Sequence, residues 1–277
     1  MESHLYLRVL RSRFVIRGDH RWIDLLTQLW EPFCSPPEGG ATEIDVSTRD
    51  RTSTFQFANR AVFEGTDPWA LCNNVRYLIL QQAQDENSTF LFLHAAVVAR
   101  KEDALVLVGP SGAGKTTLAL ALVNRGWSLV SDDVAVLEPA SGSLLSFLKP
   151  VSIKDASAFQ RYESRWSVPP WVGAPRSGFL APAALFSPSR CRGHRARAVT
   201  FLEQRRDRPT TLTPFSGARA TALLASHVGD LDAGSLGALA RLCRTAACGT
   251  LTHGRVSSAV AQLQAVAPKP LNWYKPS

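Results

Sequence analysis

The chain has 277 residues, of which 45% are hydrophobic and 19% are charged, and its formal net charge is +8. This composition is typical of a protein with a sizeable packed core and excludes an intrinsically disordered chain. Its apolar stretches are much shorter than the ~20 residues of a membrane-spanning helix, so we expect no membrane segment.

The first part of the sequence, residues 1–86, predicts a small α/β module. Alternating or β-rich stretches predict strands, and apolar residues at helical spacing predict helices. The expected elements are strands at Leu5–Leu10, Phe14–Ile16, Thr52–Phe57 and Ala61–Phe63, helices at Arg21–Trp30 and Trp69–Gln84, and a Pro- and Gly-rich loop at Phe33–Ala41. A polar run at 85–88 marks the end of this module. We therefore expect two domains, residues 1–86 and residues 87–277.

The second part, residues 87–277, begins with a strand–loop–helix–strand unit of the phosphate-binding type. Its expected elements are strands at Phe90–Val98 and Ala104–Val108, a helix that ends near Asn124, and a strand at Trp127–Val130. Beyond it we expect a hairpin of Val134–Leu137 with Leu144–Leu148, a strand at Val151–Ile153 that continues the sheet, a Pro-rich surface loop at Pro169–Pro188, a strand at Ala198–Glu203 and a helical region at Ala220–Ala247. The fold class is therefore α/β, a P-loop domain with a mixed sheet after a small N-terminal module.

The strongest motif is a glycine-rich loop that comprises Gly109, Pro110, Ser111, Gly112, Ala113, Gly114, Lys115 and Thr116, followed by Thr117. It matches G-x-x-x-x-G-K-[ST] and lies between an apolar strand and a helix, the context that this motif requires. Backbone N–H groups of such a loop surround phosphate oxygens, and the helix N-terminus favours negative charge. We expect Lys115 to reach the β- and γ-phosphates of ATP and the Thr116 hydroxyl to hold Mg²⁺.

Two adjacent carboxylates, Asp132 and Asp133, follow the strand expected at Trp127–Val130. If that strand returns beside the one before the loop, both carboxylates lie at the same sheet edge as the phosphates. One could accept a proton from an attacking hydroxyl while the other binds or orients the metal ion. A turn or helix cap is the alternative role. The spacing argues against a motor or transporter ATPase, whose metal-binding acid follows a longer insertion.

His94 directly follows the apolar run Phe90–Leu93 and precedes the loop. A histidine in such a position is more often a buried, hydrogen-bonded core residue than a functional one. Both roles stay open on the sequence pattern alone.

Positive charge is concentrated in a basic patch that comprises Arg190, Arg192, Arg195, Arg197, Arg205, Arg206 and Arg208, with His194 among them. Such a patch attracts phosphates or acidic partners, although a solvated basic loop has the same composition. No nucleic-acid-binding motif accompanies the charge, so nucleic acid is the weaker alternative as a partner.

The five cysteines are Cys34, Cys72, Cys191, Cys243 and Cys248. They form no C-x-x-C pair and their number is odd, so the sequence predicts neither a disulfide framework nor a zinc site. The arginines near the N-terminus precede no apolar block, which predicts no secretion signal. We expect reduced thiols in a cytoplasmic protein.

Four segments in this order, Leu93–Ala96, Gly109–Thr116, Arg125–Trp127 and Ser131–Asp133, resemble the catalytic domain of the HPr kinase/phosphorylase family. With Lys149–Lys154 added, they also look like the HPr-kinase-related proteins found beside peptide-modification genes, including the lasso-peptide precursor kinases. The resemblance covers about residues 90–155 and is specific for the nucleotide site.

The resemblance implies ATP- and Mg²⁺-dependent phosphorylation of a serine hydroxyl on a peptide or small protein, and a possible homo-oligomer. Carried over by position, Asp132 is the base toward the acceptor, Asp133 joins Thr116 on the metal side, and His94 lies near the γ-phosphate. Lys154 is a further candidate for contact with phosphate, and an ordinary surface lysine at a strand end is the alternative. The glutamate–arginine–glycine segment of the family has no clean match, since Arg192-Gly193 lacks the preceding acid, and this weakens the inference of a reverse, phosphorolytic reaction.

Two other functions fit the same residues. A small-molecule kinase would use the same loop and aspartates with a different acceptor. A nucleotide-binding regulatory protein would use the loop without catalysis.

Overall fold

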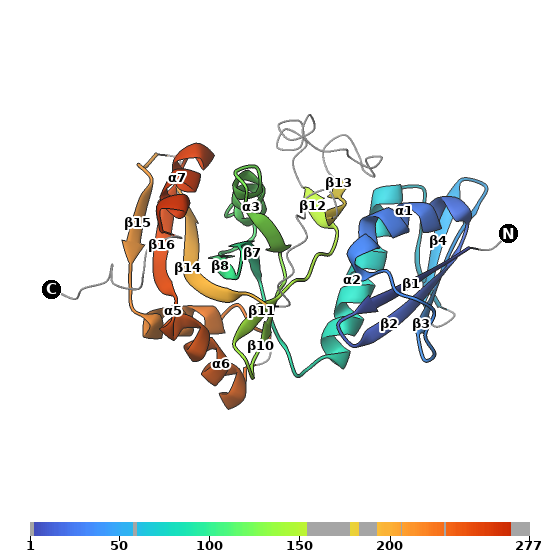
Figure 1. Cartoon of the computed structure of the whole chain (residues 1–277). Coiled ribbons are helices and arrows are strands. Elements are labelled where there is room, and N and C mark those ends of the chain that lie inside the picture. Colours follow the sequence, from blue (N-terminus) through green and yellow to red (C-terminus); the bar gives the residue numbers. More distant parts are fainter. Residues whose placement is uncertain are drawn as a thin grey trace. The chain divides into compact units, whose positions relative to one another are not determined.

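The chain is described by a computed structural model that covers residues 3–57, 60–153, 178–182, 193–205, 207–229 and 231–266 (Figure 1). The fold is mixed α/β with several sheets. Its compact units are not continuous in sequence: the first comprises Met1–Ser88 and Leu148–Leu185, and the second comprises Thr89–Phe147 and Phe186–Ser277. The expected division into 1–86 and 87–277 is linear, whereas the chain enters the first unit twice.

The first unit contains a five-stranded sheet in the order β1-β2-β3-β4-β5. Its elements are β1 (Ser3–Val9), β2 (Ser12–Gly18), α1 (His20–Trp30), η1 (Glu31–Phe33), β3 (Thr42–Arg49), β4 (Thr52–Phe57), β5 (Arg60–Gly65) and α2 (Pro68–Glu86). The strands and helices expected before residue 86 are present, and β3 is an additional strand. The β2–β3 pair is parallel and the other pairs are antiparallel.

The antiparallel pair of β12 (Val151–Ile153) and β13 (Gly178–Leu180) belongs to this unit. Phe179 is 3% exposed, and its ring stacks on Trp69 of α2 with 6.2 Å between centroids. These contacts explain why the segment groups with the N-terminal residues. The expectations that β12 continues the large sheet and that all of Pro169–Pro188 is a loop are therefore wrong.

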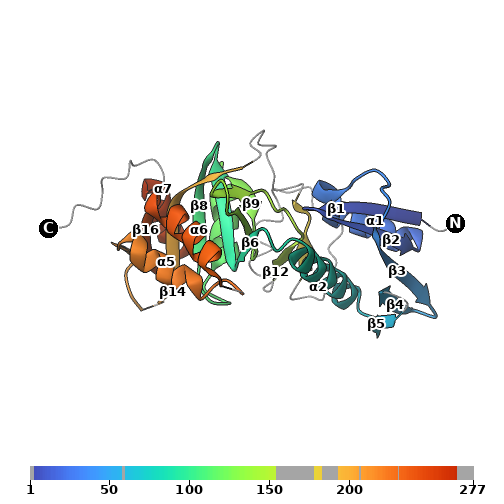
Figure 2. The same ribbon diagram turned by 90° about the horizontal axis from the view of Figure 1, so that it is seen from below.

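The second unit is built on a six-stranded sheet in the order β15-β16-β14-β8-β7-β9. Its strands are β7 (Ala95–Arg100), β8 (Asp103–Val108), β9 (Ser128–Ser131), β14 (Arg195–Gln204), β15 (Thr211–Pro214) and β16 (Ala247–His253). Its helices are α3 (Lys115–Val123), α5 (Gly217–Ala225), α6 (Ala233–Arg244) and α7 (Val256–Val266). The helices α5 and α6 lie side by side in both views (Figures 1 and 2). β7 and β8 are almost wholly buried, as expected for strands covered on both faces.

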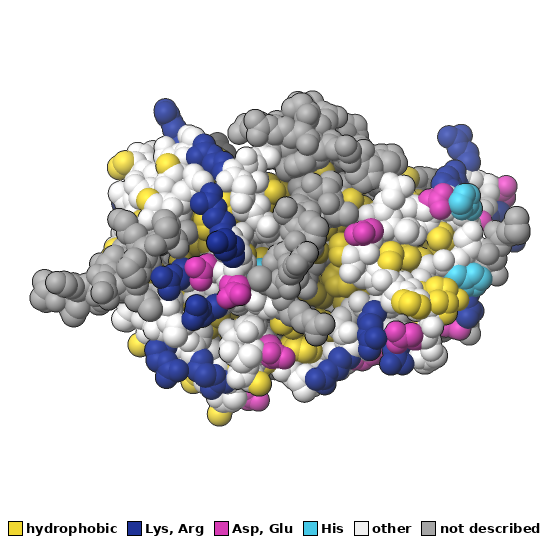
Figure 3. All heavy atoms as spheres, viewed as in Figure 1, with side chains coloured by type: hydrophobic (Ala, Val, Ile, Leu, Met, Phe, Trp, Pro, Cys, Tyr) yellow, Lys and Arg dark blue, Asp and Glu magenta, His cyan; other side chains and the backbone are white. Residues whose placement is uncertain are grey.

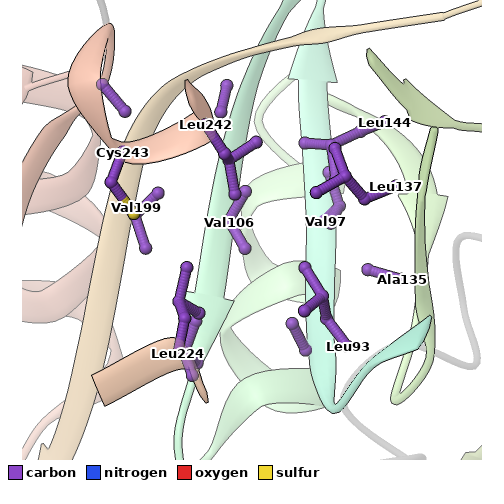
Figure 4. Close-up of a cluster of buried hydrophobic side chains, with 14 of the residues drawn as sticks. Leu93, Val97, Val106, Ala135, Leu137, Leu144, Val199, Leu224, Leu242 and Cys243 are labelled. Carbon is purple, nitrogen blue, oxygen red and sulfur yellow. The ribbon is translucent and has the colours of Figure 1, made fainter. Parts of the chain in front are cut away.

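A three-stranded antiparallel sheet of β6 (Leu91–Leu93), β10 (Ala135–Glu138) and β11 (Ser143–Leu145) packs on the larger sheet. Its buried leucines share one apolar cluster with Val97, Val106 and Val199 of the large sheet and Leu224 and Leu242 of the helices (Figure 4). This cluster fixes both sheets against α5 and α6.

The sheet topology brings four strand ends to one edge. β8, β14 and β16 are mutually parallel, and β7 is antiparallel to both β8 and β9. β9 therefore runs parallel to β8 but is separated from it by β7, so the expectation that it lies directly beside β8 is wrong. The carboxyl ends of β8, β9, β14 and β16 nevertheless meet at the same edge, because parallel strands end on the same side.

The expected strand Phe90–Val98 is two strands, β6 and β7, which belong to different sheets and are separated by His94 alone. The C-terminal region is also richer than the helices expected there. It includes β15, β16 and α7. The strand β16 was not predicted because its small and polar residues give no clear strand pattern. None of the described helices is long and apolar enough to cross a membrane.

Candidate active site

The glycine-rich loop follows β8 and leads directly into α3. Gly112 and Gly114 have φ angles of 86° and 92°, in the left-handed region that favours glycine. These two turns let the backbone curl around the N-terminus of α3, where N–H groups lack helical partners. The loop therefore has the local geometry that phosphate binding requires.

Lys115, the first residue of α3, is 6% exposed and its ammonium group is directed at the loop and at His94. Its Nζ donates to the carbonyl oxygens of Gly109 at 2.7 Å and Pro110 at 3.1 Å, and to Nε2 of His94 at 2.9 Å. A buried ammonium needs such acceptors, since burial of an unpaired charge is costly. Bound phosphate oxygens would offer stronger acceptors at the same place.

His94 connects Lys115 to Asp133. Because an ammonium group can only donate, Nε2 of His94 accepts, and Nδ1 carries the proton in the neutral ring. Nδ1 lies 3.1 Å from the carbonyl oxygen and 3.3 Å from Oδ1 of Asp133, so it donates toward Asp133. The side chains of His94 and Asp133 are 41% and 47% exposed, which leaves this carboxylate accessible from solvent.

Asp132 has different surroundings. It is 3% exposed, and its Oδ1 accepts a hydrogen bond of 2.8 Å from the Thr116 hydroxyl. The next residue, Asp133, has a φ of 65°, a left-handed conformation that aspartate tolerates better than most residues. The turn sends the two carboxylates in different directions, one to Thr116 and the other to His94.

The site therefore combines the sequence-predicted Lys115, Thr116, His94, Asp132 and Asp133. Thr117 is partly buried one residue further along α3. Lys154 lies outside the described residues. No group of three or more His, Cys, Asp or Glu side chains that could hold a metal ion occurs within the described part of the chain. A metal at Thr116 and Asp132 would hence need further ligands from water and phosphate.

The HPr kinase/phosphorylase of Pelodictyon phaeoclathratiforme is 34% identical to this chain over 79 residues, which are 28% of the chain and 24% of that relative. The HPr kinase/phosphorylase of Chlorobium luteolum is 39% identical over 61 residues, or 22% of the chain and 18% of that relative. By sequence, the chain is a distant relative of HPr kinase/phosphorylase. The chain spans about a quarter or less of the length of these curated relatives.

No protein-family model matches the chain. The solved Hpr(Ser) kinase/phosphatase of Coxiella burnetii aligns with 63% of this chain and 95% of its own, at 14% identity and a TM-score of 0.32. So low a TM-score adds nothing to the relationship with HPr kinase/phosphorylase, which rests on sequence.

Two histidines that the sequence analysis missed lie at the same site. His253, the last residue of β16, is 3% exposed and donates from Nε2 to the carbonyl oxygen of Ala113 at 3.2 Å.

The second histidine, His227, follows α5, and its carbonyl oxygen accepts a hydrogen bond of 3.1 Å from the backbone N–H of His94. Burial, together with the nearby His94 and Lys115, lowers the pKa of His227. Recognition of β16 as a parallel strand would have placed His253 at this edge.

The basic patch is not one surface. Arg195 and Arg197 lie at the start of β14, whereas Arg205 and Arg208 follow its end, and the strand between them is ten residues long. At ~3.3 Å a residue, the two pairs are on the order of 30 Å apart. Among the arginines of the patch that the structure describes, only Arg205 and Arg208 lie at the edge that carries the glycine-rich loop, and Arg205 pairs with Glu203 at 2.8 Å. Arg190, Arg192 and Arg206 lie outside the described residues. The described Lys and Arg side chains are spread over the face of the molecule seen in Figure 3.

Proposed function

We propose that the chain is an ATP- and Mg²⁺-dependent kinase that transfers the γ-phosphate to a serine hydroxyl of a peptide or small protein. The observation that carries the proposal is the series of contacts from Lys115 through His94 to Asp133, beside the phosphate loop. Nucleotide binding alone would use Lys115 but would not need a histidine-oriented, accessible carboxylate. The distant relationship to HPr kinase/phosphorylase supports the same function.

The contacts favour a division of roles opposite to the one expected from position. Asp132, not Asp133, lies against the Thr116 hydroxyl. Carboxylate and hydroxyl oxygens suit Mg²⁺, which usually keeps several waters and takes only one or two protein ligands. Thr116 and Asp132 would hold the ion, which neutralises charge on the β- and γ-phosphate oxygens when bound.

Asp133 is then the base. Its carboxylate accepts the proton of the serine hydroxyl while the serine oxygen attacks the γ-phosphorus, and the bond to the bridging oxygen breaks to release ADP. His94 donates from Nδ1 and holds Asp133 toward the phosphates. Lys115 leaves its loop carbonyls for the phosphate oxygens, where it offsets their negative charge.

The test incubates the protein with γ-labelled ATP, Mg²⁺ and serine peptides, and follows the label by mass spectrometry. We expect Asp133→Asn to lower transfer by roughly 100- to 10,000-fold, the usual range for loss of a general base, while Mg²⁺–ATP still binds. Asp132→Asn should instead weaken the Mg²⁺ dependence of nucleotide binding. Transfer that is unaffected by Asp133→Asn would overturn the assigned base.

The alternatives give different results in the same assay. A small-molecule kinase would release labelled small product and leave the peptides unlabelled. A regulatory protein would bind ATP tightly and transfer the label to no acceptor, with or without Asp133.

A further inference from the structure

Two buried cysteines of the second unit lie next to each other, away from the phosphate loop. Cys243 is in the last turn of α6 and Cys248 is near the start of β16, and they are 1% and 4% exposed. The Sγ atom of Cys248 lies 3.7 Å from the carbonyl oxygen of Cys243 and 3.5 Å from that of Ala246. These contacts place the Cys248 thiol against the C-terminal end of α6, where Cys243 lies. The proposed kinase reaction uses neither of them.

A cavity gives access to this pair. It has a volume of about 440 Å³, and both cysteines line it together with Ser216, Thr221 and Arg244. A water molecule takes up ~30 Å³ in the liquid, so the cavity can admit a hydroperoxide of similar size. Both thiols are therefore shielded from bulk solvent, but a small reagent can reach them through the cavity.

The surroundings distinguish the two thiols. The hydrogen bond with Cys248, assisted by the Thr221 hydroxyl, lowers the pKa of Cys243, whereas the same hydrogen bond and burial raise the pKa of Cys248. The thiolate is the reactive form of cysteine. The Cys243 thiol therefore ionises more readily than the Cys248 thiol.

We propose that Cys243 and Cys248 form an oxidisable dithiol, a modification site at which a hydroperoxide produces an intramolecular disulfide. The Cys243 thiolate attacks one peroxide oxygen and the O–O bond breaks. Hydroxide or an alkoxide departs, and a sulfenic acid forms on Cys243. The sulfur of Cys248 then attacks the sulfenic sulfur, the S–O bond breaks, and the hydroxyl leaves as water with the proton of Cys248. The sulfurs lose two electrons and the peroxide gains two.

The experiment treats the folded, full-length chain with hydrogen peroxide, blocks the remaining thiols with an alkylating reagent, and maps tryptic peptides by mass spectrometry without reduction. Cleavage after Arg241, Arg244 and Arg255 separates the two cysteines into peptides Leu242–Arg244 and Thr245–Arg255. We expect these two peptides linked, lighter than their sum by two hydrogens, and separate after treatment with dithiothreitol.

Cys72 is the internal control, because it is equally buried and burial raises the pKa of its thiol to about 12. It should remain reduced while the pair is oxidised. Alkylation of both Cys243 and Cys248 after peroxide treatment, or oxidation of Cys72 at the same rate, would overturn the proposal.

Two variants test the order of attack. In Cys248→Ser, Cys243 should stop at the sulfenic acid, which dimedone traps on peptide Leu242–Arg244. In Cys243→Ser, Cys248 should stay unmodified. The opposite pattern would reject Cys243 as the nucleophile. Circular dichroism verifies that both variants fold, and a Cys72→Ser variant, which should still form the linked peptides, controls for loss of a buried thiol.

Discussion

At the scale of single residues, His94 is the junction of the proposed site, since it contacts both Lys115 and Asp133. His94→Ala removes the acceptor for one side chain and the donor to the other. We expect phosphate transfer to fall by roughly 100-fold, the lower range for loss of a positioned acid–base group. Kinetics with the labelled serine peptides measures the effect. His20→Ala, which removes an exposed histidine of the first unit, serves as the control, and an equal loss in both variants would contradict the role of His94.

His194 predicts a pH dependence of stability. Its Nδ1 donates to the carbonyl oxygen of Lys101 at 3.0 Å, and its Nε2 is buried without a hydrogen-bond partner among the described residues. Burial lowers the pKa of His194 below the ordinary value of 6.5, and the hydrogen bond with Lys101 only partly opposes this. As the pH falls through 6.5, the unfolded chain takes up a proton that the folded chain does not, so the free energy of unfolding decreases.

Urea unfolding at a series of pH values measures this decrease. The variant His194→Gln should be less stable at neutral pH, because it loses packing, but its stability should fall less on acidification. An unchanged slope in the variant would assign the pH dependence to other groups, such as His227, whose pKa is lowered too.

At the scale of elements, α2 begins with a side-chain cap. The Asp67 carboxylate accepts a hydrogen bond of 2.9 Å from the backbone N–H of Trp69. Asp67→Ala should lower the free energy of unfolding by about 1 kcal/mol, as is usual for loss of an N-cap. Asp67→Ser should restore most of the stability, because serine caps helices equally well. Thermal or urea unfolding tests both variants, and equal stability of the alanine and serine forms would argue against the cap.

The sequence predicted the elements with strong local signals. The alternation at Leu5–Leu10 and the glycines at 109 and 114 identified a strand and the phosphate loop, because period and turn chemistry are local properties. The different surroundings of Asp132 and Asp133, on which the proposed exchange of their roles rests, could not be predicted, since they depend on the left-handed turn at Asp133. His227 reaches the site through the loop after α5, and no local pattern marks it.

At the scale of the whole molecule, the return of the chain into the first unit has a consequence for truncation. A chain of residues 89–277 would lack α2 and expose Phe179, which normally stacks on Trp69. We expect such a chain to bind a hydrophobic dye and to give little soluble protein. Replacement of Phe179 by Ser in the truncated chain should reduce dye binding. A soluble truncated chain that binds no dye would instead favour the linear division at residue 86.

The junction at His94 also limits how the protein can vary. One residue separates β6 from β7, and each of these strands is hydrogen-bonded into a different sheet. Insertion or deletion of a residue there would shift one strand by one position and turn its buried side chains to the opposite face. As far as folding is concerned, this part of the gene can therefore accept a codon exchange, but a change in codon number would disrupt two sheets together. The spacing around the proposed catalytic histidine is fixed by folding as well as by catalysis.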